Sequence, residues 1–597
     1  MMTEEQIGRD LATSTDAARR SLSHLRALAE QMDAEADALD AEAAIHEGRD
    51  GRAPVVSINA DGLEVQWPEG QACRVVTELA ATSAHIEVID EAAAALLLAA
   101  VATDGSVSLH VLTGDALTPI AKEVSSACFG PDGKSVIVAT LGPDGVRANA
   151  LHELSLDGAE LAPVLLAEHD ASWAVRRSSS GTMILAFRWK PIGGALLVSS
   201  GAGWREVWSS SDRELLDAEH WEAREAGGIV AIERHGDRRQ VVHLGAQKGS
   251  SIDLLRDLDP IEGSPALLTT KRRLLLATLI EGVPTLSELS DRGEWSPVQI
   301  DSVLGVTASV EVWAEDRVDV RPASFIPRCG TRTGRLREER RFVRANDGVE
   351  IPITVLRCAD RPMHGALLYV YGAFGASLVP QPSAARISLL DRGVAVVIAH
   401  VRGGGELGPN WHVSAVGPRK PRSWADLVDV AQALPAELGI APGAVVAEGN
   451  SAGGLVAACA VRDAPGAFAG LLATVPFVDP LASLLDPDDP LAAVERGEWG
   501  DPSDPAQRST IETYAPATAP IPDDHPSTLV TAAQHDARVR PETVLAWCRR
   551  LQDRDVAVHC IGSSGGHDEV SNGRDWLLGR GLQLAWTLER VRAVSRV

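Results

Sequence analysis

The sequence predicts a two-part fold in which an all-β half precedes an α/β half. Its 597 residues exceed the size at which one hydrophobic core stops growing, so at least two domains are expected. From about 54 to 325, short apolar runs alternate with turn signals. After Arg340, apolar strands alternate with stretches of helical spacing, and this change in texture separates the two halves.

The first half has the pattern of many short strands and frequent turns. Asp-Gly pairs, which favour hairpins and loops, stand at 61–62, 104–105, 132–133, 144–145 and 157–158. The apolar runs include Val55–Ile58, Val107–Leu112, Val136–Thr140, Met183–Phe187, Ala195–Ser199, Leu274–Leu279 and Val310–Trp313. This stretch is long for a single sandwich or barrel, so a β-propeller of several four-stranded blades fits best.

The chain divides into three segments on this interpretation. Residues 1–53 form an N-terminal helical segment, because Leu22, Leu25, Leu28 and Met32 recur at helical spacing. We expect a surface helix or helical hairpin packed on the body. Residues 54–335 form the propeller, and residues 336–597 form the α/β domain.

The α/β half predicts a doubly covered, mostly parallel sheet. Its strand candidates are Ala366–Val370, Ala395–His400, Val445–Ala447, Leu471–Val475, Leu529–Ala533 and Val556–Ile561. Helical spacing lies between them, for example over Trp424–Leu434 and Pro541–Leu551.

The stretch Gly449–Gly453 reads Gly-Asn-Ser-Ala-Gly between a β-branched run and a helix-forming run. This is the strand–turn–helix context of the G-x-S-x-G nucleophile elbow of α/β-hydrolases. The glycines remove the Cβ atoms that would clash in so tight a turn. Ser451 is therefore the candidate nucleophile, at the carboxyl end of a central strand.

An acid and a histidine should follow the serine in chain order. Asp536 lies just beyond the strand Leu529–Ala533, and His567 lies just beyond Val556–Ile561. The histidine would take the serine proton, and the carboxylate would fix the tautomer of the imidazole.

Three other residues remain as alternatives in these roles. His535 is an alternative base, although its adjacency to Asp536 favours a loop position. Asp479, which follows another strand, is an alternative acid, whereas His559 lies within a strand and is assigned to packing.

An oxyanion hole needs hydrogen-bond donors aimed at the tetrahedral intermediate. The elbow supplies the backbone N–H of Ala452. Tyr371, in a loop after an early strand, is the candidate for a second donor.

Composition excludes several classes of partner. The net charge of −26 is spread along the chain, which argues against nucleic acid and anionic membranes as partners and is compatible with a cleft that attracts cations. The N-terminus lacks the pattern of a signal peptide, and no long uncharged apolar run predicts a membrane span. The seven cysteines are scattered, which fits reduced thiols in a cytoplasmic protein and predicts neither a metal site nor a cofactor.

Several motifs in order resemble the prolyl oligopeptidase family over about residues 340–590. They are Tyr371–Ser377, His400–Gly408, Gly449–Leu455 and Gly566-His567. Val475–Asp479 and Glu498–Pro502 are most similar to the oligopeptidase B branch.

The resemblance implies a seven-bladed propeller over an α/β-hydrolase domain, with a cavity that admits only short peptides. It assigns Ser451, Asp536 and His567 as the triad and Tyr371 as the side-chain oxyanion donor. In oligopeptidase B, two glutamates of a Glu-x-Glu-Glu-Trp-Gly segment hold a basic P1 side chain. Here the first is Glu495, the second position is Gly497 and Glu498 follows, so the trypsin-like preference is expected to be weakened.

The leading interpretation is a cytoplasmic serine oligopeptidase, monomeric or a small homo-oligomer, that hydrolyses short peptides. The same acyl-enzyme would also serve peptide ligation, macrocyclisation or ester hydrolysis. A third reading, from a different class, is a catalytically silent propeller-based binding protein, against which the intact set of four site residues argues.

Overall fold

The computed structural model describes residues 4–32, 34 and 35, the strands between 55 and 322 with parts of their connections, and most of 336–595. Within that last range, residues 379–383, 487–491, 537, 564–566 and 568–572 are not described. The predicted boundaries at 53/54 and 335/336 fall on or beside undescribed residues and stay predictions. None of the described helices is both long enough and apolar enough to cross a membrane.

Seven antiparallel sheets follow one another along the described part of the first half. The first three comprise β1 (Val55–Asn59), β2 (Gly62–Gln66), β3 (Ala72–Val75); β4 (Ser83–Ala92), β5 (Ala95–Ala102), β6 (Val107–Thr113), β7 (Ala116–Lys122); and β8 (Val124–Phe129), β9 (Ser135–Leu141), β10 (Ala148–Ser155), β11 (Glu160–Leu165). The next two comprise β12 (Ser172–Arg177), β13 (Ile184–Trp189), β14 (Gly194–Ser199), β15 (Trp204–Ser210); and β16 (Glu214–Trp221), β17 (Gly228–His235), β18 (Arg238–Leu244), β19 (Ile252–Asp257). The last two comprise β20 (Glu262–Thr269), β21 (Leu274–Ile280), β22 (Val283–Leu289), β23 (Trp295–Pro297); and β24 (Ala308–Trp313), β25 (Arg317–Pro322).

The successive sheets from β4 to β23 pack face to face, as the blades of a propeller do. One buried cluster joins Leu196 of the β12–β15 sheet to Ala231 of the β16–β19 sheet. Similar clusters join the β4–β7 sheet to the β8–β11 sheet, the β8–β11 sheet to the β12–β15 sheet, and the β16–β19 sheet to the β20–β23 sheet. Apolar residues therefore build the core between neighbouring sheets from β4 to β23, which agrees with the expected propeller.

The second half is built on one eight-stranded sheet with the order β26-β27-β29-β28-β30-β31-β32-β33. The strands are β26 (Leu336–Arg344), β27 (Glu350–Cys358), β28 (Gly365–Val370), β29 (Val394–Ala399), β30 (Val445–Asn450), β31 (Gly470–Thr474), β32 (Thr528–Ala533) and β33 (Val558–Ser563). From β29 to β33 all neighbours are parallel, whereas β27 is antiparallel to both β26 and β29. The mostly parallel sheet is thus confirmed, and its first, antiparallel pair was not among the predicted strands.

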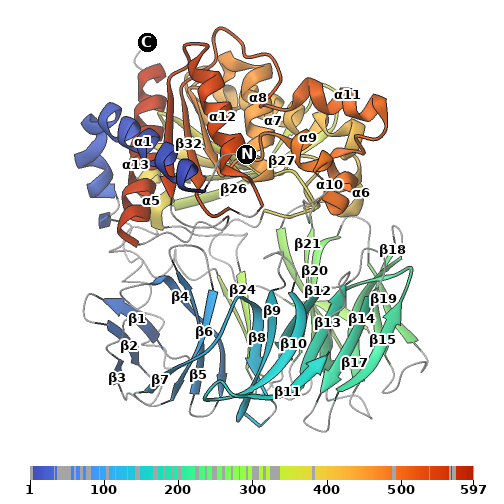
Figure 1. The fold of residues 1–597 in the computed structure, drawn as a ribbon. Coiled ribbons are helices and arrows are strands. Elements are labelled where there is room, and N and C mark those ends of the chain that lie inside the picture. Colours follow the sequence, from blue (N-terminus) through green and yellow to red (C-terminus); the bar gives the residue numbers. More distant parts are fainter. Residues whose placement is uncertain are drawn as a thin grey trace.

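Helices cover both faces of this sheet (Figure 1). One face packs on α7 (Pro421–Leu438), α8 (Ala452–Asp463) and α12 (Pro541–Gln552), and the other packs on α5 (Ala384–Leu390) and α13 (Gly573–Ser595). Shorter helices near the site are α6 (Pro409–Val413), η3 (Gly417–Arg419), η4 (Pro465–Ala467), α9 (Pro480–Leu485), α10 (Ala492–Trp499) and α11 (Pro505–Tyr514).

The N-terminal helix α1 (Glu4–Ser21) and the turn η1 (Ser23–Leu25) wrap around the β33 edge of the sheet. Ile7 and Leu11 join the core of the α8 face, whereas Leu22 and Met32 join the core of the α13 face. Between them, the backbone N–H of Gly562 in the edge strand donates to Thr15 Oγ1 at 2.6 Å. The helix therefore covers an otherwise open sheet edge, which is a common protection of edge strands. Of the four residues at helical spacing, Leu22, Leu25 and Met32 are buried and Leu28 is partly buried against the same core.

We predict that Leu11→Ala lowers the free energy of unfolding of the α/β half by about 2–5 kcal/mol, because it deletes a buried leucine beside the edge strand. Denaturant unfolding with circular dichroism measures the change. The exposed Asp16 of the same helix supplies the control, because Asp16→Ala should change stability by about 0.5 kcal/mol or less. Equal losses in the two variants would show that α1 is not packed as described.

Candidate active site

Ser451 stands in a strained turn between β30 and α8. Its φ of 51° and ψ of −123° lie where residues other than glycine are uncommon. Three hydrogen bonds fix the turn: Ser451 N donates to Thr474 O at 2.9 Å, and Ser451 O accepts from Gly454 N at 2.9 Å and Phe477 N at 3.0 Å. The neighbouring strand and the loop after it therefore hold the serine in this conformation.

Close backbone approach explains both glycines of the elbow. A Cβ on Gly449 would lie 2.2 Å from the carbonyl oxygen of Gly453. A Cβ on Gly453 would lie 2.5 Å from the carbonyl oxygen of Val370. Larger residues at either position would push the turn away from the sheet, as the sequence pattern predicts.

His567 lies between Ser451 and Asp536. Its Nε2 is 2.9 Å from Ser451 Oγ, and its Nδ1 is 2.8 Å from Asp536 Oδ2. The Asp536 side chain is 1% exposed, and its Oδ1 accepts hydrogen bonds from the backbone N–H groups of Arg538 and Val539. The carboxylate is thus held in one orientation, facing the imidazole.

The alternative acid and bases lie elsewhere. Asp479 caps the N-terminus of α9, where its carboxylate accepts from Ala482 N at 3.1 Å. His535 stands in the turn after β32, and His559 lies within β33. Neither histidine occupies the position between Ser451 and Asp536 that His567 fills.

Tyr371 follows β28 and lies against the elbow. A Cβ on Gly453 would approach Tyr371 Cα to 2.9 Å and its ring carbon Cδ2 to 3.3 Å. Burial raises the pKa of the phenol, the carboxylates of Glu498 and Glu495 add to the shift, and Arg538 opposes it. The phenol therefore stays protonated at neutral pH and can donate a hydrogen bond.

Ala452, the residue after Ser451, offers a backbone N–H as a second candidate donor. It is the first residue of α8. The N–H groups of a first helical turn have no partner within the helix. Their partial positive charge suits a developing oxyanion.

Helix α10 carries the three candidate substrate-binding residues. Glu495 is buried, and its Oε2 is 3.5 Å from Ser483 Oγ. Gly497 is exposed, and a Cβ there would meet no heavy atom within 4 Å. Glu498 is buried and forms ion pairs with Lys420 and, at 2.7 Å, with Nε2 of His412.

Comparison with known sequences places part of this domain. Residues 380–576 match the sequence family described as "Prolyl oligopeptidase family". This match covers less than half of the chain. Ser451 and Asp536, as well as His567, fall inside it.

Curated relatives match the same half. "Uncharacterized peptidase y4sO" of Sinorhizobium fredii is 38% identical over 270 residues, which cover 43% of this chain and 38% of that protein. "Dipeptidyl aminopeptidase BI" of Pseudoxanthomonas mexicana is 36% identical over 219 residues, which cover 36% of this chain and 30% of that protein. The chain therefore spans only about a third of the length of these curated relatives.

Solved structures resemble the whole chain. Oligopeptidase B from Leishmania major superposes with a TM-score of 0.78 over 98% of this chain and 92% of that one, at 17% identity. A post-proline cleaving enzyme from Rickettsia typhi superposes with a TM-score of 0.72 at 15% identity, covering 98% of this chain and 97% of that one. At these identities the likeness concerns the fold, an α/β-hydrolase domain with a β-propeller, and so confirms the predicted fold class.

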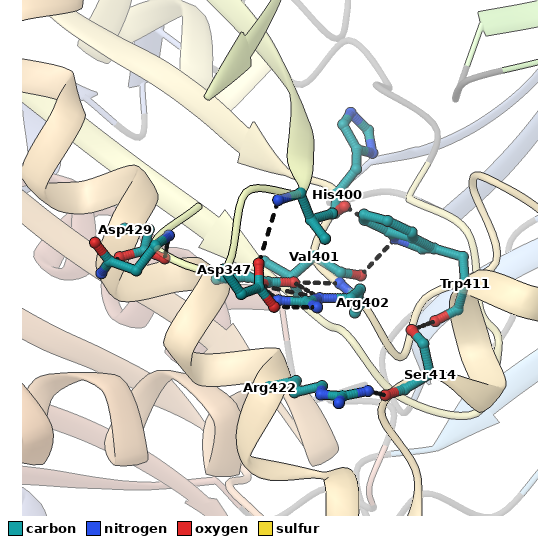
Figure 2. A network of polar contacts seen from close by, with 11 residues as sticks. Asp347, His400, Val401, Arg402, Trp411, Ser414, Arg422 and Asp429 are labelled. Atoms are coloured by element: carbon teal, nitrogen blue, oxygen red, sulfur yellow. Dashed lines mark hydrogen bonds and ion pairs between the residues drawn. The ribbon is translucent and has the colours of Figure 1, made fainter. Parts of the chain in front are cut away.

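A network of polar contacts surrounds Arg402 (Figure 2). The guanidinium of Arg402 forms ion pairs with Asp426 of α7 and, at 2.6 Å, with Asp347. Trp411 Nε1 donates to the carbonyl oxygen of Val401 at 3.0 Å, and Arg422 donates to the carbonyl oxygen of Ser414. The loop that begins at His400 is thereby fixed to α7 and to the β26–β27 turn.

Sequence reasoning did not single out several charged residues around the site. Arg538 opposes the rise in the pKa of the Tyr371 phenol, Lys420 forms an ion pair with Glu498, and His412 Nε2 lies 2.7 Å from the same carboxylate. Arg538 stands two residues after Asp536, which is a local signal that could have been used. Lys420 and Glu498 are 78 residues apart, so no spacing pattern could have paired them.

We predict that Arg402→Met lowers the free energy of unfolding by about 3–5 kcal/mol, because it leaves the buried Asp426 carboxylate without its cation. The paired variant Arg402→Met with Asp426→Leu should recover much of that loss. Arg422→Ala is the control, because this arginine is exposed and should matter by about 1 kcal/mol or less. Denaturant unfolding measures all three, and a paired variant as unstable as Arg402→Met alone would contradict the ion-pair explanation.

Proposed function

We propose that the protein is a serine peptidase that cleaves short peptides through an acyl-enzyme. The observation that carries the proposal is the hydrogen-bonded chain of Ser451, His567 and Asp536, with Nε2 facing the serine and Nδ1 facing the acid. Membership of residues 380–576 in the prolyl oligopeptidase family supports the same reaction class. The strained, partly exposed position of Ser451 has no evident structural purpose apart from chemistry.

In the first half of the proposed reaction, Ser451 Oγ attacks the scissile carbonyl carbon while His567 Nε2 takes its proton. The carbonyl oxygen becomes an oxyanion, which the Ala452 N–H and the Tyr371 hydroxyl stabilise. The C–N bond then breaks as His567 returns the proton to the leaving amine. Asp536 remains ionised and stabilises the imidazolium throughout.

In the second half, water attacks the acyl-enzyme carbonyl and gives its proton to His567. Collapse of this second intermediate releases the carboxylic acid and returns the proton to Ser451. An amine in place of water would give ligation, and an ester substrate would enter by the same route. No feature of the described site favours these alternatives, so hydrolysis is the function proposed.

The restriction to short peptides rests on the propeller. In Figure 1 the blades of the first half lie directly opposite the α/β domain, on the side of β26, α10 and α6. Several solved proteins with this fold are named oligopeptidases. We therefore propose that the propeller limits access to Ser451 by size.

For the P1 side chain we propose tolerance of basic residues with reduced selectivity. Of the two glutamates of α10, Glu498 is already paired with Lys420 and His412. We assign the contact with a P1 cation to Glu495, which stands at the first glutamate position of the oligopeptidase B motif. Glu498 is not proposed as a substrate ligand, in contrast to the expectation from sequence.

Cytoplasmic location and a monomeric or small homo-oligomeric state complete the proposal. Among the cysteines whose side chains are described, Cys128, Cys358, Cys459, Cys548 and Cys560 are buried free thiols. Such thiols suit a reducing compartment.

We predict that Ser451→Ala lowers kcat by about 10³-fold or more while the protein stays folded, because triad members act as a unit. A fluorophosphonate probe should label the wild type and not this variant. His535→Ala is the matched control and should label normally. Normal labelling of Ser451→Ala, or an unlabelled wild type, would overturn the proposed function; mass analysis of the peptide products distinguishes hydrolysis from ligation.

We predict that Gly497→Glu raises selectivity for P1 Arg over P1 Ala about 10-fold, equivalent to about 1.4 kcal/mol. The added side chain has room, and a second carboxylate would help to neutralise the guanidinium. Gly497→Gln is the control, since it has the same shape without the charge. The measurement is kcat/KM on matched peptides, and a wild type strongly selective for Arg and indifferent to Gly497→Glu would place the P1 site elsewhere.

A further inference from the structure

Lys420 is a fully buried lysine, 0% exposed, whose ammonium group reaches two parts of the site. Its Nζ donates to the carbonyl oxygen of Gly372 at 2.8 Å and forms an ion pair with Glu498. The residue itself sits between η3 and the first residue of the 18-residue helix α7. A cation on so rigid a support can act as a fixed anchor for the segments that it contacts.

The first anchored segment is the turn that carries Tyr371. Gly372 follows Tyr371 directly and has a φ of 66°, a conformation that favours glycine, and the turn itself follows at Phe374 and Gly375. Ser423 Oγ of α7 also donates to the Gly372 carbonyl, at 3.2 Å. On the other side of the turn, a Cβ on Gly375 would lie 3.3 Å from the His412 ring, so His412 packs against it.

The second anchored segment is helix α10. Glu498 binds Lys420 with Oε1 and His412 with Oε2, so both carboxylate oxygens are engaged. Burial works to raise the pKa of Glu498, but His412 and Lys420 outweigh it and the pKa is lowered. The carboxylate therefore stays charged and holds α10, with Glu495 and Gly497, against the Tyr371 turn.

Trp499 extends these contacts to the elbow. Lys420 Nζ lies 4.9 Å from the centroid of its ring. The centroid of the Trp499 ring lies 5.8 Å from that of Phe374 in the Tyr371 turn and 5.4 Å from that of Phe477. The backbone N–H of Phe477 donates in turn to Ser451 O. The ammonium group thus lies where the Tyr371 turn, the loop at Phe477 and α10 meet.

We propose that Lys420 is a positioning residue that sets the placement of the Tyr371 hydroxyl and links it, through Glu498, to the substrate-binding helix α10. The inference rests on the proposed peptidase function. Lys420 is not a catalytic residue, because it is buried behind the turn and contacts a backbone carbonyl rather than the reacting atoms.

The test replaces the ammonium with an apolar group of similar length, Lys420→Met. We expect kcat to fall about 10²-fold with a much smaller change in KM, because a displaced oxyanion donor weakens only transition-state binding. Arg419→Met is the matched control: this neighbouring cation is exposed, contacts the carbonyl oxygen of Val413 and should leave kcat unchanged.

A double-mutant cycle with Tyr371→Phe separates positioning from general damage. If Lys420 acts through Tyr371, adding Lys420→Met to Tyr371→Phe should cost little further activity. Fully additive losses would overturn the proposal. Lys420→Met with Glu498→Gln removes the unpaired buried carboxylate; recovery of wild-type kcat in this variant would also overturn it, since the loss would then come from the stranded charge.

A spectroscopic measurement makes the outcome independent of turnover. The chain has only three tyrosines, Tyr369, Tyr371 and Tyr514, so ¹³Cζ-tyrosine labelling gives three resonances that Tyr→Phe variants assign. Lys420→Met should shift the Tyr371 resonance and leave that of Tyr369, which donates to Asn450 instead, in place. An unmoved Tyr371 overturns the positioning role, whereas a shifted Tyr371 in a protein without peptidase activity would overturn the proposed function alone.

Discussion

The turn at Ser451 is the constraint on which the rest of the site depends. A non-glycine residue at φ 51° costs of order 1–3 kcal/mol, and it persists only when its surroundings over-determine it. Here the surroundings are the neighbouring strand at Thr474, the loop at Phe477 and the bare backbone of Gly449 and Gly453. Thr474 and Gly449 belong to parallel strands of the sheet, Gly453 belongs to the crossover helix α8, and Phe477 lies in the loop after β31. The parallel sheet and its connections thus stabilise the strained backbone conformation of Ser451.

The partners of the serine reach it because parallel strands end on one edge of the sheet. Tyr371, Ser451, Asp536 and His567 each follow a different strand of the same sheet, β28, β30, β32 and β33. The strand that leads to His567 is the outermost one, and it has a neighbouring strand on one side only. Helix α1 supports its other side through Thr15 and Leu11, so the first residues of the chain stabilise the strand before the histidine.

Local patterns explain what the sequence could predict. The elbow, the order of serine, acid and histidine, and the parallel strands all depend on residues close together in the chain. The β26–β27 hairpin was not predicted from the sequence, because six of the nine residues of β26 (Leu336–Arg344) are Arg or Glu and few are apolar. The packing of α1 on the sheet edge was not predicted from the sequence, because the burial of Ile7 and Leu11 depends on the position of that edge.

Long-range charge pairing explains what the sequence could not predict. Arg402 pairs with Asp426 and Asp347, which lie 24 and 55 residues away in the sequence. Lys420 donates to the carbonyl oxygen of Gly372, which lies 48 residues away. Glu498 illustrates the consequence. By motif, Glu498 lies among the glutamates expected to bind substrate. In the fold, however, it forms an ion pair with Lys420 and lies 2.7 Å from His412 Nε2.

The two buried ion pairs share a physical logic. Removing ions from water costs several kcal/mol each, so a buried pair is often no more stabilising than apolar side chains of similar volume. Arg402–Asp426 and Lys420–Glu498 are both buried, and both fasten a loop of the site to a helix beside it. Apolar contacts would hold the same segments with similar energy, but they are not directional. A hydrogen-bonded ion pair fixes the angle as well as the distance. The proposed role of Tyr371 as an oxyanion donor would require this, since the effect of such a donor depends on geometry within a fraction of an ångström.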